Sequence, residues 1–269
     1  MTDIALRHQL VVTEVRRRWR NNMLFAGGIV LIILLSLWYG GFFELQRYAK
    51  GINGVVSIIV TEGLPPDFTR WRSWLVPLLD TAAMSIAGTA GAILIALSLC
   101  VFAAANTTPH TALYVVSRMI LNTLRAFPEL IMGIILLAAV GLGILPGILA
   151  LVFHSAGMIG KFFAETMEHV DQAPVEAVRA CGGNSIQVLT HGIFPQVLPQ
   201  FADVCIYRWE CNFRASTVMG MVGCGGIGFE LHSALSIMEY RQVTALLMLV
   251  VACVTVVDGC GIWLRRYFK

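Results

Sequence analysis

Long apolar runs, separated by short polar or proline-containing stretches, dominate the pattern along the chain. A bilayer core about 30 Å thick needs about 20 consecutive apolar residues in a helix. The charge-free stretch 81–117 is too long for one such helix, and the polar segment 106–110 divides it in two. The pattern therefore predicts an all-α membrane protein with six transmembrane helices, at about 23–39, 77–104, 113–141, 146–163, 198–221 and 243–264.

These spans divide the chain into four parts and place both ends on one side of the membrane. We expect a tail at 1–22, a first helix with a periplasmic loop at 23–76, a core at 77–264 and a tail at 265–269. The first tail holds five arginines and the last holds three basic residues. Because Lys and Arg accumulate on the cytoplasmic side, both termini are predicted to be cytoplasmic. The loop after the first helix has room for a short interfacial helix.

Composition excludes a soluble enzyme. Hydrophobic residues make up 57% of the chain and charged residues only 13%, against about 45–50% and about 25% in soluble domains. The net charge of +3 suggests no nucleic-acid partner. The seven cysteines are scattered without a C-x-x-C motif, so we expect small buried residues of membrane helices rather than a metal site or a disulfide framework.

The segment between the fourth and fifth predicted spans, about 165–196, has the signals of a compact helix-turn-helix. Asp171 is placed to cap a helix whose first turn contains Pro174. That helix is expected to run through Ala180 and to end in a left-handed turn at Gly182-Gly183. A second short helix, capped by residue 184 or 185, is expected to end before Pro195. Such a segment can simply link two spans, but a rigid surface helix also suits a partner's groove.

The residues of this segment resemble a known motif. Glu176-Ala177, with Gly182 and Pro195 at the matching distances, is similar to the EAA loop of ABC-importer permeases. The sequence departs from the family pattern at three positions: Val178, Gly192 and Phe194.

The resemblance covers roughly 77–264, and the segments 151–161, 207–215 and 223–228 carry it further. They are similar to the permeases of phosphonate-type importers, a group that includes phosphite and hypophosphite permeases. This implies a type I ABC importer permease fold in the bacterial inner membrane. It also implies a homodimeric pore, two ABC ATPase subunits and a periplasmic substrate-binding protein, which together move a small phosphorus oxyanion by alternating access. The ATPase-coupling residues that it implies are Glu176, Ala177, Arg179, Gly182, Gly183 and Pro195.

The chain has no P-loop of its own. The only Gly-Lys pair is Gly160-Lys161, with Ser155 where the first glycine of the motif belongs and Phe162 where Ser or Thr belongs. A P-loop needs those residues to cradle phosphates. We therefore expect a transport subunit that is not an enzyme and binds no cofactor, with ATP and Mg²⁺ held by the partner ATPase.

Polar residues in the predicted fifth span have two interpretations. A charge at the bilayer centre costs about 2.5–3.5 kcal/mol on insertion scales, so such residues usually face the bundle interior and pair. Glu210 and Arg214 stand four residues apart, in the order that favours a pair on one helix face. They form either an ion pair between helices or subunits, or part of a polar wall along which an oxyanion passes. The candidates for that pathway are Arg208, Glu210, Asn212, Arg214, Ser216 and Thr217.

Other features of the core are less specific. The segment 223–228, which contains four glycines, matches G-x-G-x-x-G, but no βαβ unit surrounds it. Close helix packing or an irregular turn at the end of the span fits them better, and the resemblance implies a place at the periplasmic mouth for Gly223, Gly225, Gly226 and Gly228. His154 is expected to be a packing and hydrogen-bonding residue. Arg118 and Arg125 are expected to reach the cytoplasmic interface, and Asp258 is expected to be paired.

Two other classes of function are alternatives to the importer. An intramembrane enzyme needs a nucleophile or metal set, and neither G-x-S-x-G nor H-E-x-x-H occurs. A self-contained secondary transporter of a small anion commonly has two related halves. No internal repeat is detectable in this sequence. A secondary transporter needs no ATPase, however, so this class stays the alternative to the importer.

Overall fold

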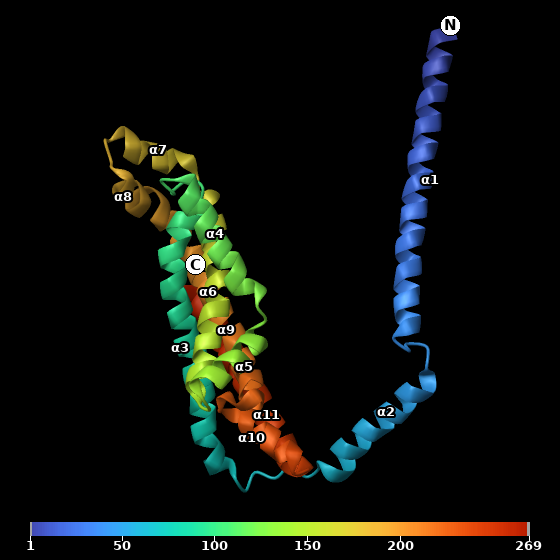
Figure 1. The fold of residues 1–269 in the computed structure, drawn as a ribbon, viewed down its shortest axis with the longest axis vertical. Helices are drawn as coiled ribbons and strands as arrows, with labels where there is room; N and C mark the ends of the chain where they lie inside the picture. The colour runs from blue at the N-terminus through green and yellow to red at the C-terminus, as the bar shows by residue number, and fades with distance from the viewer. Residues whose placement is uncertain (1, 268–269) are drawn as a thin grey trace. The chain divides into compact units, whose positions relative to one another are not determined.

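Every regular element in the computed structural model, which describes residues 2–267, is a helix (Figure 1). The α-helices are α1 (Thr2–Tyr39), α2 (Leu45–Ser57), α3 (Trp71–Ala103), α4 (Thr111–Ala126), α5 (Glu129–Val140), α6 (Ile144–Glu168), α7 (Gln172–Ala180), α8 (Ser185–Gln187), α9 (Phe194–Met219), α10 (Ile227–Ser236) and α11 (Tyr240–Tyr267). Three π-helical turns accompany them: η1 (Ile58–Glu62), η2 (Val188–Ile193) and η3 (Gly220–Cys224).

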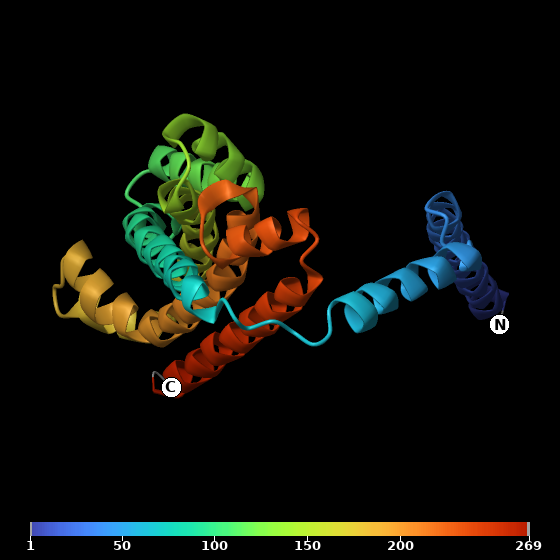
Figure 2. The same ribbon diagram turned by 90° about the horizontal axis from the view of Figure 1, so that it is seen from below.

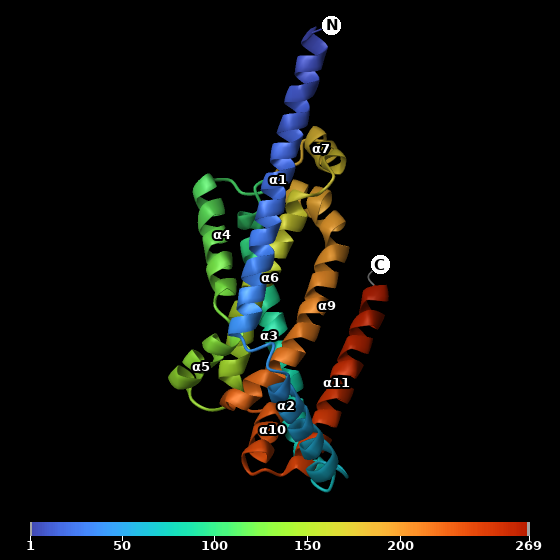
Figure 3. The ribbon, with the colours of Figure 1, turned by 90° about the vertical axis from the view of Figure 1, so that its right-hand side faces the viewer.

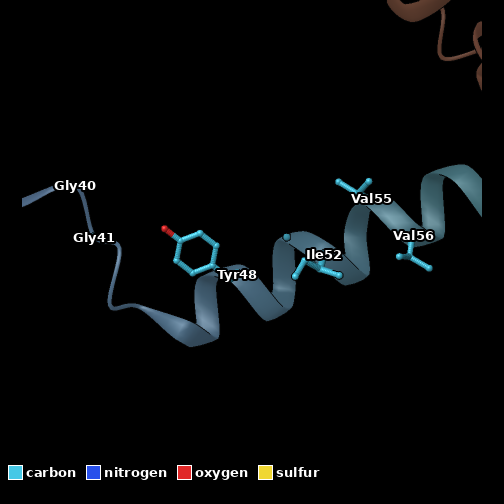
Figure 4. A pocket seen from close by; sticks show the side chains of 7 residues that line it. Gly40, Gly41, Tyr48, Ile52, Val55 and Val56 are labelled. Atoms are coloured by element: carbon cyan, nitrogen blue, oxygen red, sulfur yellow. The ribbon is translucent and has the colours of Figure 1, made fainter. Parts of the chain in front are cut away.

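The chain separates into two compact units at Thr61 and Glu62. The first unit contains α1, whose stretch Glu14–Tyr39 is long and apolar enough to cross a membrane, followed by α2. The short helix expected in the first loop is thus present, with 13 residues. Figure 4 shows Tyr48, Ile52 and the two valines Val55 and Val56 along α2, beside the turn at Gly40 and Gly41.

In the second unit, α3 and α6 pack along most of their length, with α4 and α9 against them (Figures 1 and 3). Small residues allow this close approach. A Cβ on Gly88 of α3 would lie 2.8 Å from the Leu151 Cβ of α6. The helices of this unit therefore associate through close packing of their backbones. This is usual in a membrane, because the apolar lipid leaves no hydrophobic driving force for helix association.

Two of the expected spans are sharply bent. The helices α4 and α5 meet at 87°, and the helix that ends at Cys224 meets α10 at 55°. Pro128 divides the predicted span at 113–141, because its backbone is extended and caps α5. The span expected at 113–141 is therefore two helices, which together can still form one bent span. Among residues 2–267, four helices are long and apolar enough to span a membrane, or up to six if each bent pair counts as one span.

The two ends of the second unit differ. Helices α7 and α8 project from one end, and α10 lies at the opposite end (Figures 1 and 3). Near the α7 end, the rings of Phe163 and Phe201 stack with centroids 3.7 Å apart inside a buried cluster from α3, α6, α7 and α9. Figure 2 shows α11 at the edge of this unit, where it contacts α9.

Candidate functional site

The helix α7 begins and ends where the sequence predicts. Asp171 caps it, because its Oδ1 accepts a hydrogen bond of 3.0 Å from the Ala173 N–H. At the other end, the Gly182 N–H donates to the Arg179 carbonyl at 2.9 Å and the Gly183 N–H donates to the Val178 carbonyl at 3.0 Å. This pair of bonds is a Schellman motif. Gly182 has φ = +83°, a conformation that glycine adopts without strain.

The second helix of the predicted helix-turn-helix starts as expected but does not end as expected. Asn184 and Gln187 form a reciprocal capping box, with bonds of 2.9 Å and 2.8 Å. The chain then continues through η2 directly into α9. The predicted end before Pro195 is wrong, because Pro195 lies in the first turn of α9, a position at which proline is common.

One face of α7 is anchored and the other is open. Val175 is buried against η2, where a Cβ on Gly192 would lie 3.2 Å from its Cα. Glu176, Ala177 and Arg179 are exposed. Thus α7 presents three of the predicted coupling residues to solvent while its buried side fixes it to the bundle.

The start of α7 is also tied to the start of α9. The Gln196 side chain accepts from the Asp171 N–H at 3.1 Å and donates to the carbonyls of Asp171 at 3.2 Å and Gly192 at 2.6 Å. A single amide therefore links the cap of α7, η2 and the first turn of α9.

An ion pair between Arg118 and Glu168 joins the loop after α3 to the end of α6. Arg118 of α4 donates to both oxygens of Glu168 at 2.8 and 2.9 Å and to the Ala103 carbonyl at 3.0 Å. Glu168 also accepts from the Ala105 N–H at 2.8 Å. The sequence predicts only that Arg118 reaches the cytoplasmic interface. In the structure its side chain pairs with Glu168, which is 50 residues away in sequence. The pair holds α3, α4 and α6 together a few residues before α7.

We expect Arg118→Glu to destabilise the protein, because like charges then face each other and the Ala103 carbonyl loses its donor. Hydrogen bonds to charged groups contribute about 1.5–3 kcal/mol, and the partial exposure of both side chains places the loss at the lower end of that range. The measurement is thermal unfolding in detergent. The exchange Arg118→Glu with Glu168→Arg should recover part of the stability, and no recovery would show that the two side chains do not interact.

Four of the six predicted pathway residues are buried within the chain. Arg208, Glu210, Asn212 and Ser216 are 9%, 5%, 0% and 0% exposed. Asn212 accepts from the Ser155 hydroxyl and donates to the Thr89 hydroxyl, both at 2.9 Å. These bonds join α3, α6 and α9.

The buried network continues to the break between α4 and α5. Arg208 donates to the Ser155 hydroxyl at 2.9 Å and to Glu129 at 3.4 Å. His154 lies with Nδ1 3.0 Å from the Phe127 carbonyl, which fits the hydrogen-bonding role expected for it. The network therefore holds the 87° break in place.

The predicted ion pair between Glu210 and Arg214 does not form. Glu210 accepts from Arg265 at 2.6 Å, and Arg214 donates to Asp258 at 2.9 Å. Both partners lie on α11, so the interpretation as ion pairs between helices is confirmed for this chain. The expectation that Asp258 is paired is also confirmed. The two pairs differ in burial: the Glu210 side chain is 7% exposed, whereas those of Arg214 and Asp258 are 46% and 44% exposed.

The predicted glycine cluster forms a tight irregular turn between η3 and α10. Gly225 and Gly226 have φ values of +78° and +75°, which favour glycine. The Ile227 N–H donates to the Thr81 hydroxyl at 2.9 Å, which fixes the start of α10 to α3. A Cβ on Gly220 would lie 2.5 Å from the Gly225 carbonyl, so both close packing and an irregular turn are present.

The loop before α3 meets the first turn of α11. The Asp67 N–H donates to the Arg241 carbonyl at 3.2 Å. The Thr69 N–H donates to the Asp67 carboxylate at 2.8 Å, and this bond lowers the pKa of Asp67. The contact closes the α10 end of the second unit.

The seven cysteines are all free, and most are not buried. Cys100 and Cys224 are buried, whereas Cys181 and Cys260 are exposed. Cys181 follows α7 rather than lying in a membrane helix, so the expectation fails for that residue. Within residues 2–267, no group of three His, Cys, Asp or Glu side chains is placed to hold a metal ion.

The fold and these sites define a multi-pass permease of the inner membrane with the type I ABC importer fold. Residues 96–269 match the family model described as "Binding-protein-dependent transport system inner membrane component". The match covers more than half of the chain, and the chain belongs to this family.

Relatives and a solved structure agree with this assignment. The chain is 56% identical over 238 residues to the phosphite transport system permease protein PtxC of Stutzerimonas stutzeri, covering 88% of this chain and 86% of the relative. It is 36% identical to the putative phosphite transport system permease protein HtxC of the same organism, covering 92% and 87%. A chain of the MetNI methionine ABC transporter in an inward-facing conformation superposes with a TM-score of 0.66 at 20% identity, covering 75% of this chain and 99% of that chain. That likeness shows the fold.

Proposed function

We propose that this chain is the membrane-spanning subunit of an ATP-driven importer for a small phosphorus oxyanion, with phosphite as the first candidate. The observation that carries the proposal is the 56% identity with a phosphite permease over nearly the full length of both chains. Phosphonate and hypophosphite are the other candidates, because the resemblance includes their permeases. In this proposal a separate binding protein delivers the anion from the periplasm.

The coupling element in this proposal is α7 with the turn that follows it. A groove in the partner ATPase would grip the exposed face that carries Glu176, Ala177 and Arg179. The buried Val175 and the Gln196 link support this role, because they make α7 move as one body with η2 and α9. Closure of the ATPase pair then rocks the helices around a central pathway. ATP and Mg²⁺ are held by the ATPase, and α7 is the element of this chain that moves with it.

The pathway would run along the exposed side of α9, between two copies of the chain. Arg214 and Thr217 are the two predicted pathway residues on that side that are not buried. Charged side chains that their own chain leaves open at membrane depth normally face water or another protein. Arg208, Glu210, Asn212 and Ser216 would instead hold each copy in shape. This division of roles between exposed and buried side chains supports a pore at the interface of a homodimer.

The orientation follows from the same proposal. With α7 toward the ATPase, the α7 end and both termini are cytoplasmic. The glycine turn at 223–228 and the Asp67–Arg241 contact are then at the periplasmic mouth, where the binding protein docks. The basic residues Arg265 and Arg266 in the last turn of α11 support this orientation.

The experiment is mild-detergent extraction of the tagged chain from its native cell, followed by native mass and composition. The proposal predicts two copies of the chain with two copies of a P-loop ATPase. Addition of the binding protein with phosphite should then stimulate ATP hydrolysis. A complex that contains this chain and one paralogous permease would contradict the homodimer, and a chain recovered without any ATPase would contradict the importer.

A further inference from the structure

The ion pair between Arg214 and Asp258 lies at membrane depth without being buried by its own chain. Asp258 precedes Arg265 by seven residues, which at 1.5 Å per residue is about 10 Å along α11. Arg265 lies in the basic last turn of α11, so Asp258 is well inside the apolar span. Yet nearly half of each side chain in the pair is exposed. In the second ion pair between the same helices, the side chains of Glu210 and Arg265 are only 7% and 24% exposed, so greater exposure distinguishes the Arg214 pair.

Arg214 keeps donors available beside this carboxylate. Its Nη1 donates to one oxygen of Asp258 at 2.9 Å, and its Nη2 makes only a weak contact of 3.8 Å with the Cys211 sulfur. A guanidinium has five N–H donors in a planar fork that fits the oxygens of a carboxylate or a phosphorus oxyanion. Asp258 and a phosphorus oxyanion are therefore alternative partners for the same donors.

We propose that Asp258 is an internal competitor of the transported anion at Arg214, and that it keeps the anion from being retained in the pathway. This inference rests on the proposed function. An anion that reaches Arg214 displaces the carboxylate, and the carboxylate later displaces the anion, so one charge-assisted hydrogen bond replaces another in both directions. Transport requires binding that is favourable enough for entry and weak enough for exit. An unopposed arginine at this depth would hold a dianion too tightly.

The test is equilibrium binding of radiolabelled phosphite to the full-length permease, purified with its ATPase and without the binding protein. Asp258→Asn should bind phosphite at least tenfold more tightly than the unaltered protein and should import it more slowly. Glu210→Gln is the matched control, because it removes one carboxylate from the same two helices at the buried pair, and it should gain no binding. Asp258→Glu should restore weak binding.

The double variant Arg214→Gln with Asp258→Asn should lose the gained binding while the complex stays intact. Equal phosphite affinity in Asp258→Asn and the unaltered protein would overturn the proposal. Loss of the permease dimer in the double variant would also overturn it, because the pair would then be an assembly contact.

A second measurement needs no substitution. Cys211 lies beside Arg214, so a water-soluble thiol reagent should modify it in the unaltered complex, and phosphite should slow that modification. The buried Cys100 is the internal control and should not react. Modification of Cys211 by lipid-soluble reagents alone would overturn the proposal. If the binding results hold but the complex imports no phosphite with ATP, the proposed function fails and the competition at Arg214 stands.

Discussion

Gly182→Pro is expected to abolish ATP-driven uptake while the protein still inserts into the membrane. Gly182 has φ = +83°, and its N–H donates to the Arg179 carbonyl. Proline fixes φ near −65° and has no N–H, so the turn after α7 loses both its backbone geometry and one of its two closing hydrogen bonds. In the proposed mechanism, a displaced α7 would no longer pass the movement of the ATPase to α9. We expect uptake to fall at least about tenfold, a factor that corresponds to about 1.4 kcal/mol.

The matched control is Gly182→Asn, because asparagine tolerates the left-handed conformation better than other non-glycine residues and keeps the N–H. This variant should retain most of the uptake. Both variants should be recovered from the membrane in similar amounts, as measured by immunoblotting of the membrane fraction. Normal uptake in Gly182→Pro would show that the turn has no part in coupling.

Gly157→Val is expected to lower the free energy of unfolding of the protein more than any other single glycine-to-valine change in α6. A Cβ on Gly157 would lie 2.7 Å from both the Arg125 backbone nitrogen and the Leu121 carbonyl of α4. Backbone atoms cannot turn aside as a flexible side chain can, so α4 and α6 must separate. Overpacking of a close-packed interior typically costs 1–3 kcal/mol, as an order of magnitude. The measurement is the apparent Tm in detergent.

Gly259→Val is the control for this prediction. A Cβ on Gly259 of α11 would meet nothing within 4 Å, so the added side chain requires no movement of the helices of this chain. Its apparent Tm should stay close to that of the unaltered protein. Equal apparent Tm values for Gly157→Val and Gly259→Val would contradict the close approach of α4 and α6.

Local signals were sufficient to predict α7 and its ends. Asp171, Pro174 and Gly182 each act within a few residues of their own position, so their meaning does not depend on the rest of the fold. The glycine turn was recognised in the same way, because a run of glycines marks irregular backbone wherever it occurs. The apolar runs likewise located most of the membrane helices, although α3 begins at Trp71, ahead of the expected start at 77.

Long-range partners were beyond the reach of sequence spacing. The i,i+4 rule suggested a pair between Glu210 and Arg214, but α11 brings Arg265 and Asp258 closer to them. Arg118 and Glu168, 50 residues apart, are joined only by the packing of α4 on α6. The division of α9 into a buried and an exposed polar side also depends on which helices cover it. Polar residues in one span are therefore pathway candidates only after its neighbours are known.

Uptake into proteoliposomes tests the central claim most directly. The chain is reconstituted with its ATPase, the binding protein and labelled phosphite are added outside, and ATP is enclosed. Our account predicts phosphite accumulation that requires both ATP and the binding protein and is unaffected when the proton gradient is collapsed. Accumulation driven by a proton gradient in liposomes that contain this chain alone would contradict it and would identify a secondary transporter.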